Sequence, residues 1–339
     1  MYLQSLATAF PGREYTQAEC LGILRDSGGL DGLKPRSRQI LEKILTGDSG
    51  IATRRLAPGD LGEVLGHDAG GLHRVFEEQA PVLASEALRR ACEQAGRPPG
   101  EIDALLICTC TGYLCPGLTS HVSELLGMRQ DAFLQDLLGL GCGAAIPILE
   151  AARCISAARP GALIATVAVE ISSAAFYLDD DPGVLISLCL FGDGAAACLW
   201  HSENQGGQFR FSNFRTIHKP GHREKIRFVN ANGKLKNQLH RSVPELAAEA
   251  VAELYALRTQ DPGKIIAHTG GRDVIEALEA ALPGHRLDET REVLRRYGNI
   301  SSPSVLIALG EALATPARNL WLTAFGAGFA AHSCELTRE

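Results

Sequence analysis

The sequence predicts an α/β fold made of two similar halves, and two observations predict it. Between residues 81 and 202, apolar runs typical of buried strands alternate with helical patterns, and a second series of the same kind covers residues 244–336. A polar, glycine-rich stretch at 203–208 separates the two series. A chain of 339 residues with 45% hydrophobic side chains can bury a core of this size. We therefore place the halves at residues 1–205 and 206–339.

The spacing of apolar residues predicts the helices and strands of the first half. Apolar residues at helical spacing predict a helix over 81–96, and the continuous apolar run 103–110 is typical of a strand buried on both faces. The pattern then predicts a helix over 119–127, an extended segment over 132–138, a helix starting at Cys142, and strands over 162–170 and 194–202.

The second half repeats the alternation. Its pattern predicts helices over 244–258, 272–282 and 288–297, and strands over 264–270, 319–329 and 330–336. Ser301, Ser302 and Pro303 mark the start of one more helix.

Charge and composition exclude several classes of protein. The formal net charge is −6 and the pI is near 6.0, whereas a nucleic-acid coat carries a basic excess. No apolar run reaches the roughly 18 to 20 residues that span a bilayer, and the N-terminus has no signal-peptide pattern. We therefore expect a cytoplasmic protein that binds neither nucleic acid nor membrane. An anionic substrate must be bound by local basic groups.

The ten cysteines lie mostly inside apolar runs, which is typical of reduced, buried thiols in a reducing compartment. The spacing of Cys108, Cys110 and Cys115 lacks the second pair of ligands that a zinc site needs. We predict no metal site.

Cys142 is a candidate nucleophile because it lies between Gly141 and Gly143, where an apolar run changes into a helical pattern. The glycines permit a tight turn and the close approach of a substrate. A helix that begins near Cys142 would lower the pKa of its thiol, which is ordinarily about 8.5. The alternative is that a small residue is needed where strand meets helix.

His268 and Asn299 are the matching candidates from the second half. His268 ends the apolar run "KIIAHTGG", and an imidazole beside a thiol can accept its proton and later donate to an oxyanion. Asn299 precedes the helix marked by Ser301 to Pro303. The alternatives are a core histidine with satisfied hydrogen bonds and an asparagine that caps the helix.

Several motifs occur in the order found in one family. They are "CTGYLCPGLTSHVSELLGM", "GLGCGAA", "LCLFGDGAAA", "AHTGG" followed by "YGNISSPSVL", and "AFGAGF". From about Gly50 to Leu336 the chain resembles the type III polyketide synthases, which include the chalcone and stilbene synthases. The resemblance implies the thiolase-like fold, in which two similar halves form five αβαβα layers, and a homodimer with one Cys-His-Asn site per subunit.

The resemblance also implies the chemistry of Cys142, His268 and Asn299. Cys142 would take the acyl group from a starter acyl-CoA, and His268 and Asn299 would bind the thioester oxygen of malonyl-CoA as carbon dioxide leaves. The resulting enolate would attack the Cys142 thioester, in a decarboxylative Claisen condensation that can be iterated. Coenzyme A thioesters are the substrates, and no other cofactor is expected.

Further positions match the walls of the family's cavity. Phe191 resembles a gatekeeping phenylalanine, with core packing as the alternative, and Asn237 falls where a second aromatic gatekeeper stands in relatives. The small cavity-lining residues implied by the match are Cys110, Thr111, Cys115, Ser172, Ala175 and Ser301. Cys115 also matches a position that reaches across the dimer.

Coenzyme A phosphates require cations, and the family's basic cluster is only partly present, as Lys43, Arg54 and Arg55. Arg272, which follows the "HTGG" turn, is a further candidate. The basic run "HKPGHREKIR", with Lys219, Arg223, Lys225 and Arg227, is either a phosphate site or a solvated loop.

The sequence can be compared with three alternative functions. A β-ketoacyl-ACP synthase III has the same fold and triad but performs one condensation with an acyl-carrier protein, and the "YGNISSPSVL" and "AFGAGF" motifs favour the polyketide synthases. A papain-like protease has its cysteine near the N-terminus in a "CGSCW"-like context that is absent here. A non-catalytic thiolase-fold partner subunit would lack one member of the triad.

Overall fold

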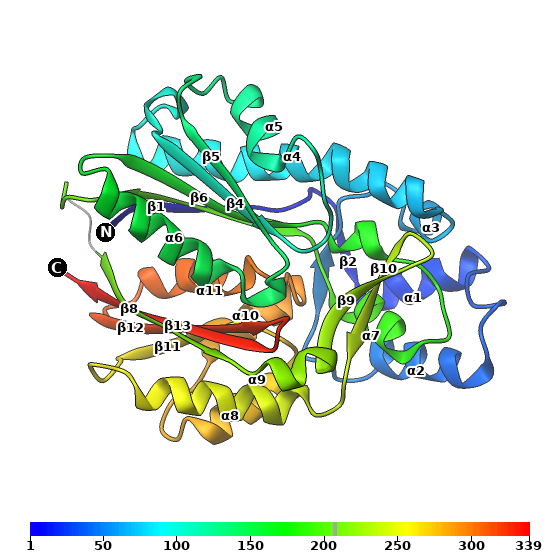
Figure 1. Ribbon diagram of the computed structural model, residues 1–339. Coiled ribbons are helices and arrows are strands. Elements are labelled where there is room, and N and C mark those ends of the chain that lie inside the picture. The colour runs from blue at the N-terminus through cyan, green and yellow to red at the C-terminus, as the bar shows by residue number, and fades with distance from the viewer. Residues whose placement is uncertain (206–208) are drawn as a thin grey trace.

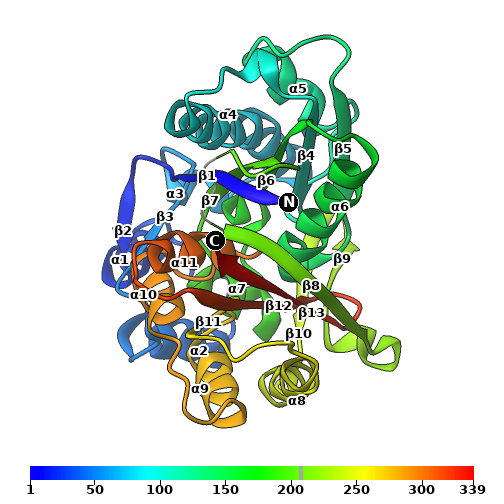
Figure 2. The same ribbon diagram turned by 90° about the vertical axis from the view of Figure 1, so that its left-hand side faces the viewer.

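The computed structural model describes residues 1–205 and 209–339 of the chain as a stack of five alternating layers of helices and sheet (Figures 1 and 2). Two helices lie at the centre, a layer of strands lies on each side of them, and further helices cover both outer faces. The predicted five-layer α/β fold is confirmed.

The two layers of strands are the two arms of one mixed sheet. The first arm has the order β1 (Tyr2–Ala9), β7 (Gly194–His201), β6 (Leu163–Glu170), β4 (Ala104–Thr109) and β5 (Phe133–Leu138). The second has the order β8 (Phe209–His218), β13 (Ala330–Arg338), β12 (Asn319–Gly326) and β11 (Lys264–Ala267). They join where β1 pairs with β8 through Tyr2 with Arg210 and Leu3 with Phe209.

Both faces of the inner strands β4, β6 and β7 are buried, which explains their continuous apolar runs. In β4, Leu106 and Cys108 face the central helices, whereas Leu105 and Ile107 face the outer ones. The central layer consists of α6 (Ala145–Ala158) and α11 (Ser304–Leu313). The outer helices are α4 (Ala69–Ala95) and α5 (Leu118–Leu125) on one side, and α8 (Val243–Ala256), α9 (Arg272–Ala281) and α10 (Asp288–Tyr297) on the other.

The remaining elements lie to one side of the layers and border the candidate site (Figure 1). They are β2 (Glu14–Thr16), α1 (Gln17–Asp26), α2 (Pro35–Thr46), β3 (Thr53–Arg55), α3 (Leu61–Leu65), α7 (Pro182–Leu190), and the hairpin of β9 (Ile226–Ala231) and β10 (Lys234–Leu239). The short 3₁₀ turns are Pro99–Glu101, Gly141–Gly143, Ser172–Ala175 and Pro220–Lys225.

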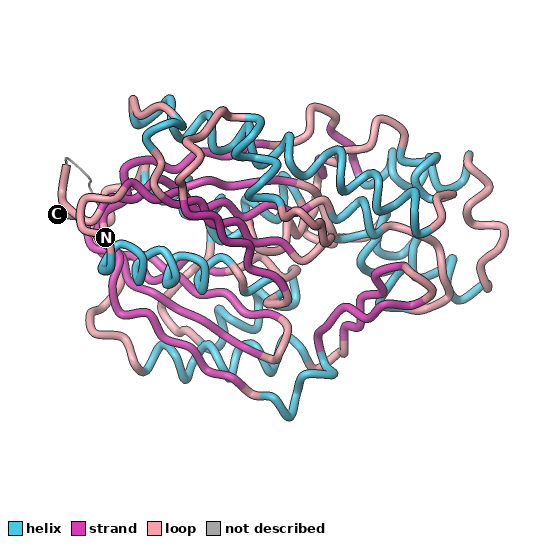
Figure 3. Tube along the Cα trace, turned by 45° about the horizontal axis from the view of Figure 1, so that its top comes forward, coloured by secondary structure: helices cyan, strands magenta, loops and turns pink. Residues whose placement is uncertain are grey.

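The hairpin β9–β10 stands apart from the large sheet as a separate two-stranded ribbon (Figure 3). Its turn consists of Asn232 and Gly233, whose φ angles are +55° and +80°. An Asn-Gly pair is favoured there because both turn residues need positive φ. The turn sets the register that places Phe228 opposite Asn237.

Two predicted helix starts differ from the structure. The helix predicted over 81–96 begins at Ala69, since Leu72 and Phe76 extend its buried face upstream of Pro81. The helix predicted from Cys142 begins at Ala145, because a separate 3₁₀ turn precedes it.

The predicted domain boundary between residues 205 and 206 borders residues 206–208, which lie outside the described residues. The division into halves therefore stays a prediction, although the two arms of the sheet come from residues 2–201 and 209–338.

Candidate active site

Cys142 lies in the 3₁₀ turn that connects β5 to α6, and it is 8% exposed. The turn requires its glycines. Gly141 has a φ of +59°, and a Cβ on Gly143 would lie 3.0 Å from the His332 ring and 3.2 Å from the Gly326 backbone nitrogen. The turn thus packs closely against the backbone of β12, and this contact fixes the position of the Cys142 sulfur.

His268 lies just after β11, with its backbone N–H bonded to Thr323. Its Nδ1 lies 2.7 Å from the Ser304 hydroxyl, which itself donates to the Ser301 carbonyl oxygen. Since that hydroxyl has one hydrogen, it must accept from His268, and Nδ1 therefore carries the ring proton. Nε2 is left with a free lone pair that can accept a proton.

Asn299 lies between α10 and α11, beside Phe191, with which it forms an isolated β-bridge. Its Nδ2 donates to the Gly270 carbonyl oxygen at 2.7 Å, and its Oδ1 accepts from the Ser301 N–H at 2.8 Å. An amide NH₂ has two hydrogens, so one N–H of Asn299 is left for a ligand.

Cys142, His268 and Asn299 line one cavity, which we call the first chamber. The structure brings the three side chains to one cavity, as predicted, and they come from three different connections. In the chain, His268 follows Cys142 by 126 positions and Asn299 follows His268 by 31. Phe325 packs edge-on against the His268 ring and completes the wall behind it.

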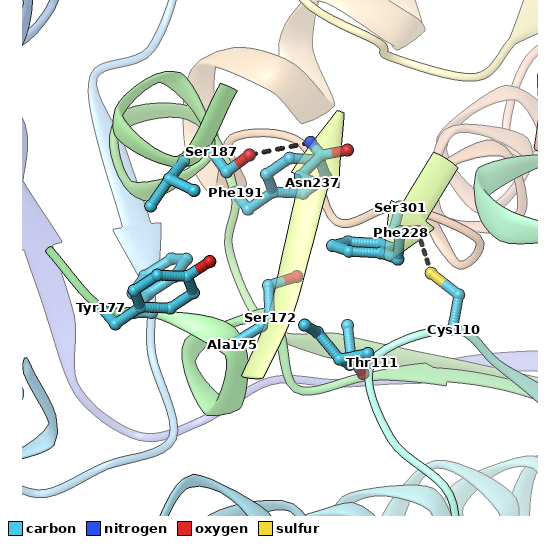
Figure 4. A pocket seen from close by; sticks show the side chains of 13 residues that line it. Cys110, Thr111, Ser172, Ala175, Tyr177, Ser187, Phe191, Phe228, Asn237 and Ser301 are labelled. Carbon is cyan, nitrogen blue, oxygen red and sulfur yellow. Dashed lines mark hydrogen bonds between the residues drawn. The ribbon is translucent and has the colours of Figure 1, made fainter. Parts of the chain in front are cut away.

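A second chamber adjoins the first, and Figure 4 shows it from close by. Five of the six small cavity residues predicted from the resemblance line it, namely Cys110, Thr111, Ser172, Ala175 and Ser301. Cys115 does not, because it is exposed and lines neither chamber. The Ser172 hydroxyl is buried without a hydrogen-bond partner, so this wall retains an unused polar group.

Three side chains line both chambers: Phe191, Asn237 and Phe228. Phe191 was predicted at this position, and Asn237 was identified as replacing an aromatic residue. Phe228 was missed, although the Asn-Gly turn in "FVNANGKLKN" fixes the pairing that sets it opposite Asn237. An aromatic ring is therefore present between the chambers, on the strand opposite the one expected.

Arg54 cannot bind a phosphate, which corrects the prediction. It is fully buried, and its guanidinium donates to Gln17, to the carbonyl oxygens of Leu188 and Phe191, and to Cys20. It joins α1 to the end of α7 and supports the segment that carries Phe191. Its buried charge is compensated by acceptors from the surrounding elements.

The other predicted phosphate ligands lie at the surface. Lys43 is exposed on α2, and Arg55 pairs with Glu14. Arg272 is partly exposed at the start of α9 and bonds the backbone of Asp48. From the basic run, Arg227 lines the first chamber, which favours a ligand role over that of a solvated loop.

Burial acts against the charged form of each reactive group in the empty site. It raises the pKa of the Cys142 thiol to about 12 and lowers the pKa of the His268 imidazole to about 4. The prediction that a helix start lowers the pKa of Cys142 is therefore wrong for the empty site, because α6 begins three residues later and desolvation dominates.

The rate of Cys142 alkylation should consequently follow pH without a plateau. Between pH 7 and 10, the rate with iodoacetamide should rise about tenfold per unit, because the thiolate fraction rises by that factor below the pKa. Peptide mass spectrometry of protein quenched at timed intervals measures this rate at Cys142. A thiolate–imidazolium pair would instead react at a constant rate from about pH 5 to 9.

Comparisons with known proteins add independent information. A family model described as chalcone and stilbene synthases, N-terminal domain, matches residues 70–203. The chain is 29% identical to a 3,5-dihydroxyphenylacetyl-CoA synthase of Streptomyces toyocaensis, covering 95% of this chain and 86% of that protein. It is 27% identical to a phloroglucinol synthase of Pseudomonas fluorescens, covering 95% of each.

Solved structures of the same fold cover the whole chain. The structure of PKS-I from the brown alga Ectocarpus siliculosus matches with a TM-score of 0.88 and 24% identity, over 100% of this chain and 98% of that one. The 1,3,6,8-tetrahydroxynaphthalene synthase of Streptomyces coelicolor, a bacterial type III polyketide synthase, matches with a TM-score of 0.87 and 24% identity, over 100% and 99%. At this identity the structural matches establish the fold.

Proposed function

The chain belongs to the type III polyketide synthases of the chalcone and stilbene synthase family, and from this we propose that it condenses a starter acyl-CoA with malonyl-CoA, iteratively, through an acyl group bound to Cys142. The observation that carries the proposal is the first chamber, where a thiol, an imidazole and a carboxamide line one cavity. Each of the three is positioned by contacts of its own.

The first step is acyl transfer to Cys142. The free lone pair of His268 Nε2 accepts the thiol proton, the sulfur attacks the thioester carbonyl of the starter, and coenzyme A leaves as a thiolate that water protonates. Proton transfer within the chamber replaces a neutral pair by an ion pair with no change in net charge. This route suits a site in which burial disfavours either charge alone.

The second step is decarboxylation of malonyl-CoA. His268 Nε2, which now carries the proton, and the free N–H of Asn299 donate to the thioester oxygen of malonyl-CoA. Carbon dioxide leaves, and the electron pair of the broken bond forms an enolate that these donors stabilise. The enolate carbon then attacks the Cys142 thioester, and the sulfur leaves with the bonding electrons.

The growing chain enters the second chamber in this proposal. That chamber adjoins the first across Phe191, Phe228 and Asn237, and its walls carry hydroxyl and thiol groups from Thr111, Ser172 and Cys110. A poly-β-keto chain carries an oxygen on every second carbon, so such walls can accept or donate hydrogen bonds along it.

We place the phosphates of coenzyme A near Arg227 and Arg272, with Lys43 as a weaker candidate. Arg227 lines the first chamber, and Arg272 is partly exposed one turn beyond the segment that carries His268. A guanidinium group binds phosphate oxygens in a bidentate manner.

Removing one of the two aromatic rings between the chambers should change the products. In Phe228→Ala the chambers merge, and we expect products at least one acetate unit longer, because specificity of this kind depends on about 1 to 3 kcal/mol. Liquid chromatography with mass spectrometry measures the product masses. Val229→Ala is the matched control, since the next residue on a strand points to the opposite face and Val229 lines neither chamber. An unchanged product distribution at full activity would contradict the proposed partition.

We also propose a homodimer formed along β5. This strand is the edge of the sheet and exposes Phe133, Leu134 and Leu138 by 38 to 41%, with Tyr113 and Leu125 more than half exposed nearby in the chain. An apolar edge strand left uncovered promotes uncontrolled association, and a second copy of the chain would cover it. Sedimentation equilibrium should give twice the chain mass of 36.2 kDa, and Leu134→Lys should shift it toward the single mass. A wild-type chain that stays monomeric at micromolar concentration contradicts this arrangement.

Intact-protein mass spectrometry with a panel of acyl-CoA substrates, followed by product analysis with labelled malonyl-CoA, tests the proposed function. Acyl loading with multi-acetate products supports it. A single condensation that requires an acyl-carrier protein would support the β-ketoacyl-ACP synthase III alternative. Loading that never occurs with any acyl-CoA would favour a non-catalytic partner subunit.

Two further proposals concern conditions for activity. All ten cysteines are free thiols, which fits a reducing compartment, and we propose that the protein works in the cytoplasm. No helix among residues 1–205 and 209–339 is long and apolar enough to cross a bilayer. The proposed steps use only thiol, imidazole and carboxamide groups, so coenzyme A thioesters would be the only small molecules required.

A further inference from the structure

Glu170, at the end of β6, is a fully buried carboxylate that the steps above do not use. Five donors point at its two oxygens. Oε2 accepts from the Thr109 hydroxyl, the Cys110 N–H and the Thr111 hydroxyl at 2.9 to 3.1 Å, and Oε1 accepts from Ser302 at 2.6 Å and Ser301 at 3.3 Å. All five groups can donate a hydrogen bond, so together they suit a carboxylate, which only accepts. Among the described residues, no cationic side chain forms an ion pair with it.

Ser301 connects this carboxylate to the proposed nucleophile. Its hydroxyl lies 3.2 Å from the Cys142 sulfur and 3.3 Å from Glu170 Oε1, and it is the hydrogen-bond partner that the thiol has in the structure. The residue has a φ of +53°, an unfavourable value for a serine, and the Asn299 side chain holds it there by accepting its N–H. The position of this hydroxyl is therefore fixed by the site itself.

One hydroxyl hydrogen cannot serve both acceptors at once. A carboxylate is a stronger hydrogen-bond acceptor than a neutral thiol. A thiolate carries the same charge as the carboxylate and can therefore compete with it for the Ser301 hydrogen. The direction of the Ser301 O–H bond must therefore depend on the charge of the Cys142 sulfur.

We propose that Ser301 is a positioning residue that turns its hydroxyl between two acceptors, toward Glu170 while Cys142 is a thiol and toward the sulfur while Cys142 is a thiolate. Glu170 thereby holds the nucleophile in its neutral form between turnovers. The hydroxyl stabilises the sulfur in the two steps that put charge on it, attack on the starter and departure from the growing chain. The proposal rests on Cys142 being the nucleophile of the proposed function.

The electrostatics of the site agree with this arrangement. After burial, which raises the pKa of Cys142 most, the hydrogen bond from Ser301 lowers it and the charge of Glu170 raises it. The other titratable groups that face this pair are Cys110 and Cys108 from β4 and the segment after it, and His268 from the segment after β11. Cys110 also lies 3.2 Å from the Ser301 hydroxyl and competes for it as a neutral thiol.

The test is the alkylation rate of Cys142 by iodoacetamide from pH 7 to 10, in a double-mutant cycle of Glu170→Gln and Ser301→Ala. Glu170→Gln should accelerate alkylation about tenfold at a given pH, which corresponds to one pKa unit. Ser301→Ala should slow it and should remove most of the acceleration in the double variant. The proposal would be overturned if Glu170→Gln did not accelerate alkylation. It would also be overturned if the acceleration were the same with and without the Ser301 hydroxyl, because Glu170 would then act on Cys142 only through space.

Ser302→Ala is the matched control, because Ser302 bonds the same carboxylate oxygen, whereas the hydrogen bond to the Cys142 sulfur comes from Ser301. Its alkylation rate should stay within about threefold of the wild type. Ser301→Gly, which adopts positive φ without strain, repeats the test if the alanine variant folds poorly. A Ser302→Ala effect equal to that of Ser301→Ala would overturn the proposal in favour of general loosening. The assay uses no acyl-CoA, so its result is independent of whether polyketide synthesis is observed.

Discussion

Cys142→Ala should abolish the covalent loading of acyl groups and all condensation, because Cys142 is the only thiol among the described residues that lines the first chamber with His268 and Asn299. The expected loss is complete within detection, which exceeds 1,000-fold, since the covalent step has no substitute. Intact-protein mass spectrometry after incubation with acyl-CoA measures the loading directly.

Cys154→Ala serves as the control for this experiment. Cys154 is an exposed cysteine on α6, the helix that follows Cys142, so its loss tests for general effects on that helix. Loading should be unchanged in Cys154→Ala. Persistent loading of Cys142→Ala at another residue would disprove the assignment of the nucleophile.

Asn299→Asp should lower the decarboxylation of malonyl-CoA about 100- to 1,000-fold, the usual effect of losing one donor to an oxyanion. Aspartate keeps an acceptor oxygen for the Ser301 N–H but has no N–H for the thioester oxygen, and its charge opposes the enolate. Release of labelled carbon dioxide from malonyl-CoA measures this step. Acyl loading of Cys142, measured on the same preparation, should remain.

Asn299→Asp keeps the acceptor for the Ser301 N–H and loses one structural contact, the hydrogen bond that Nδ2 donates to the Gly270 carbonyl oxygen. Asn299→Ala would also release the Ser301 backbone, so its loss of activity has two causes. If Asn299→Asp releases carbon dioxide at a rate within threefold of the wild type, the carboxamide is not a donor in this step. Selective loss of decarboxylation with loading intact is the result that supports its proposed role.

The sequence predicts the layers well because buried strands and amphipathic helices have distinct periods. The helix Asp288–Tyr297 has the predicted bounds, because its buried residues recur at helical spacing among charged ones, namely Thr290, Val293, Leu294 and Tyr297. The helix Pro182–Leu190 was not predicted, because it is apolar on nearly every side and shows no helical period. The N-terminal elements up to residue 65 were missed, although α2 has a helical pattern in which Ser37, Leu41 and Leu45 form one buried face.

Several properties of the candidate site depend on tertiary structure and could not be predicted from local sequence patterns. The three residues of the first chamber could be identified from motifs, but the burial of Arg54 depends on carbonyl oxygens at the end of α7, which no local pattern reveals. The pKa of Cys142 was predicted from a helix start and reversed by desolvation, which depends on every element around it. Phe228 was missed since its importance arises from pairing across a hairpin.

The first chamber draws its sulfur from the turn just before α6 and its carboxamide from the segment just before α11, and these two helices form the layer that has one arm of the sheet on each of its two sides. The strands on those two sides are hydrogen-bonded to each other only near the ends of β1 and β8 among the described residues. The rate of turnover should therefore depend on how closely α6 and α11 pack against each other. A substitution in that layer that moves the helices apart by a fraction of an ångström would silence the enzyme while its circular dichroism spectrum still looked native.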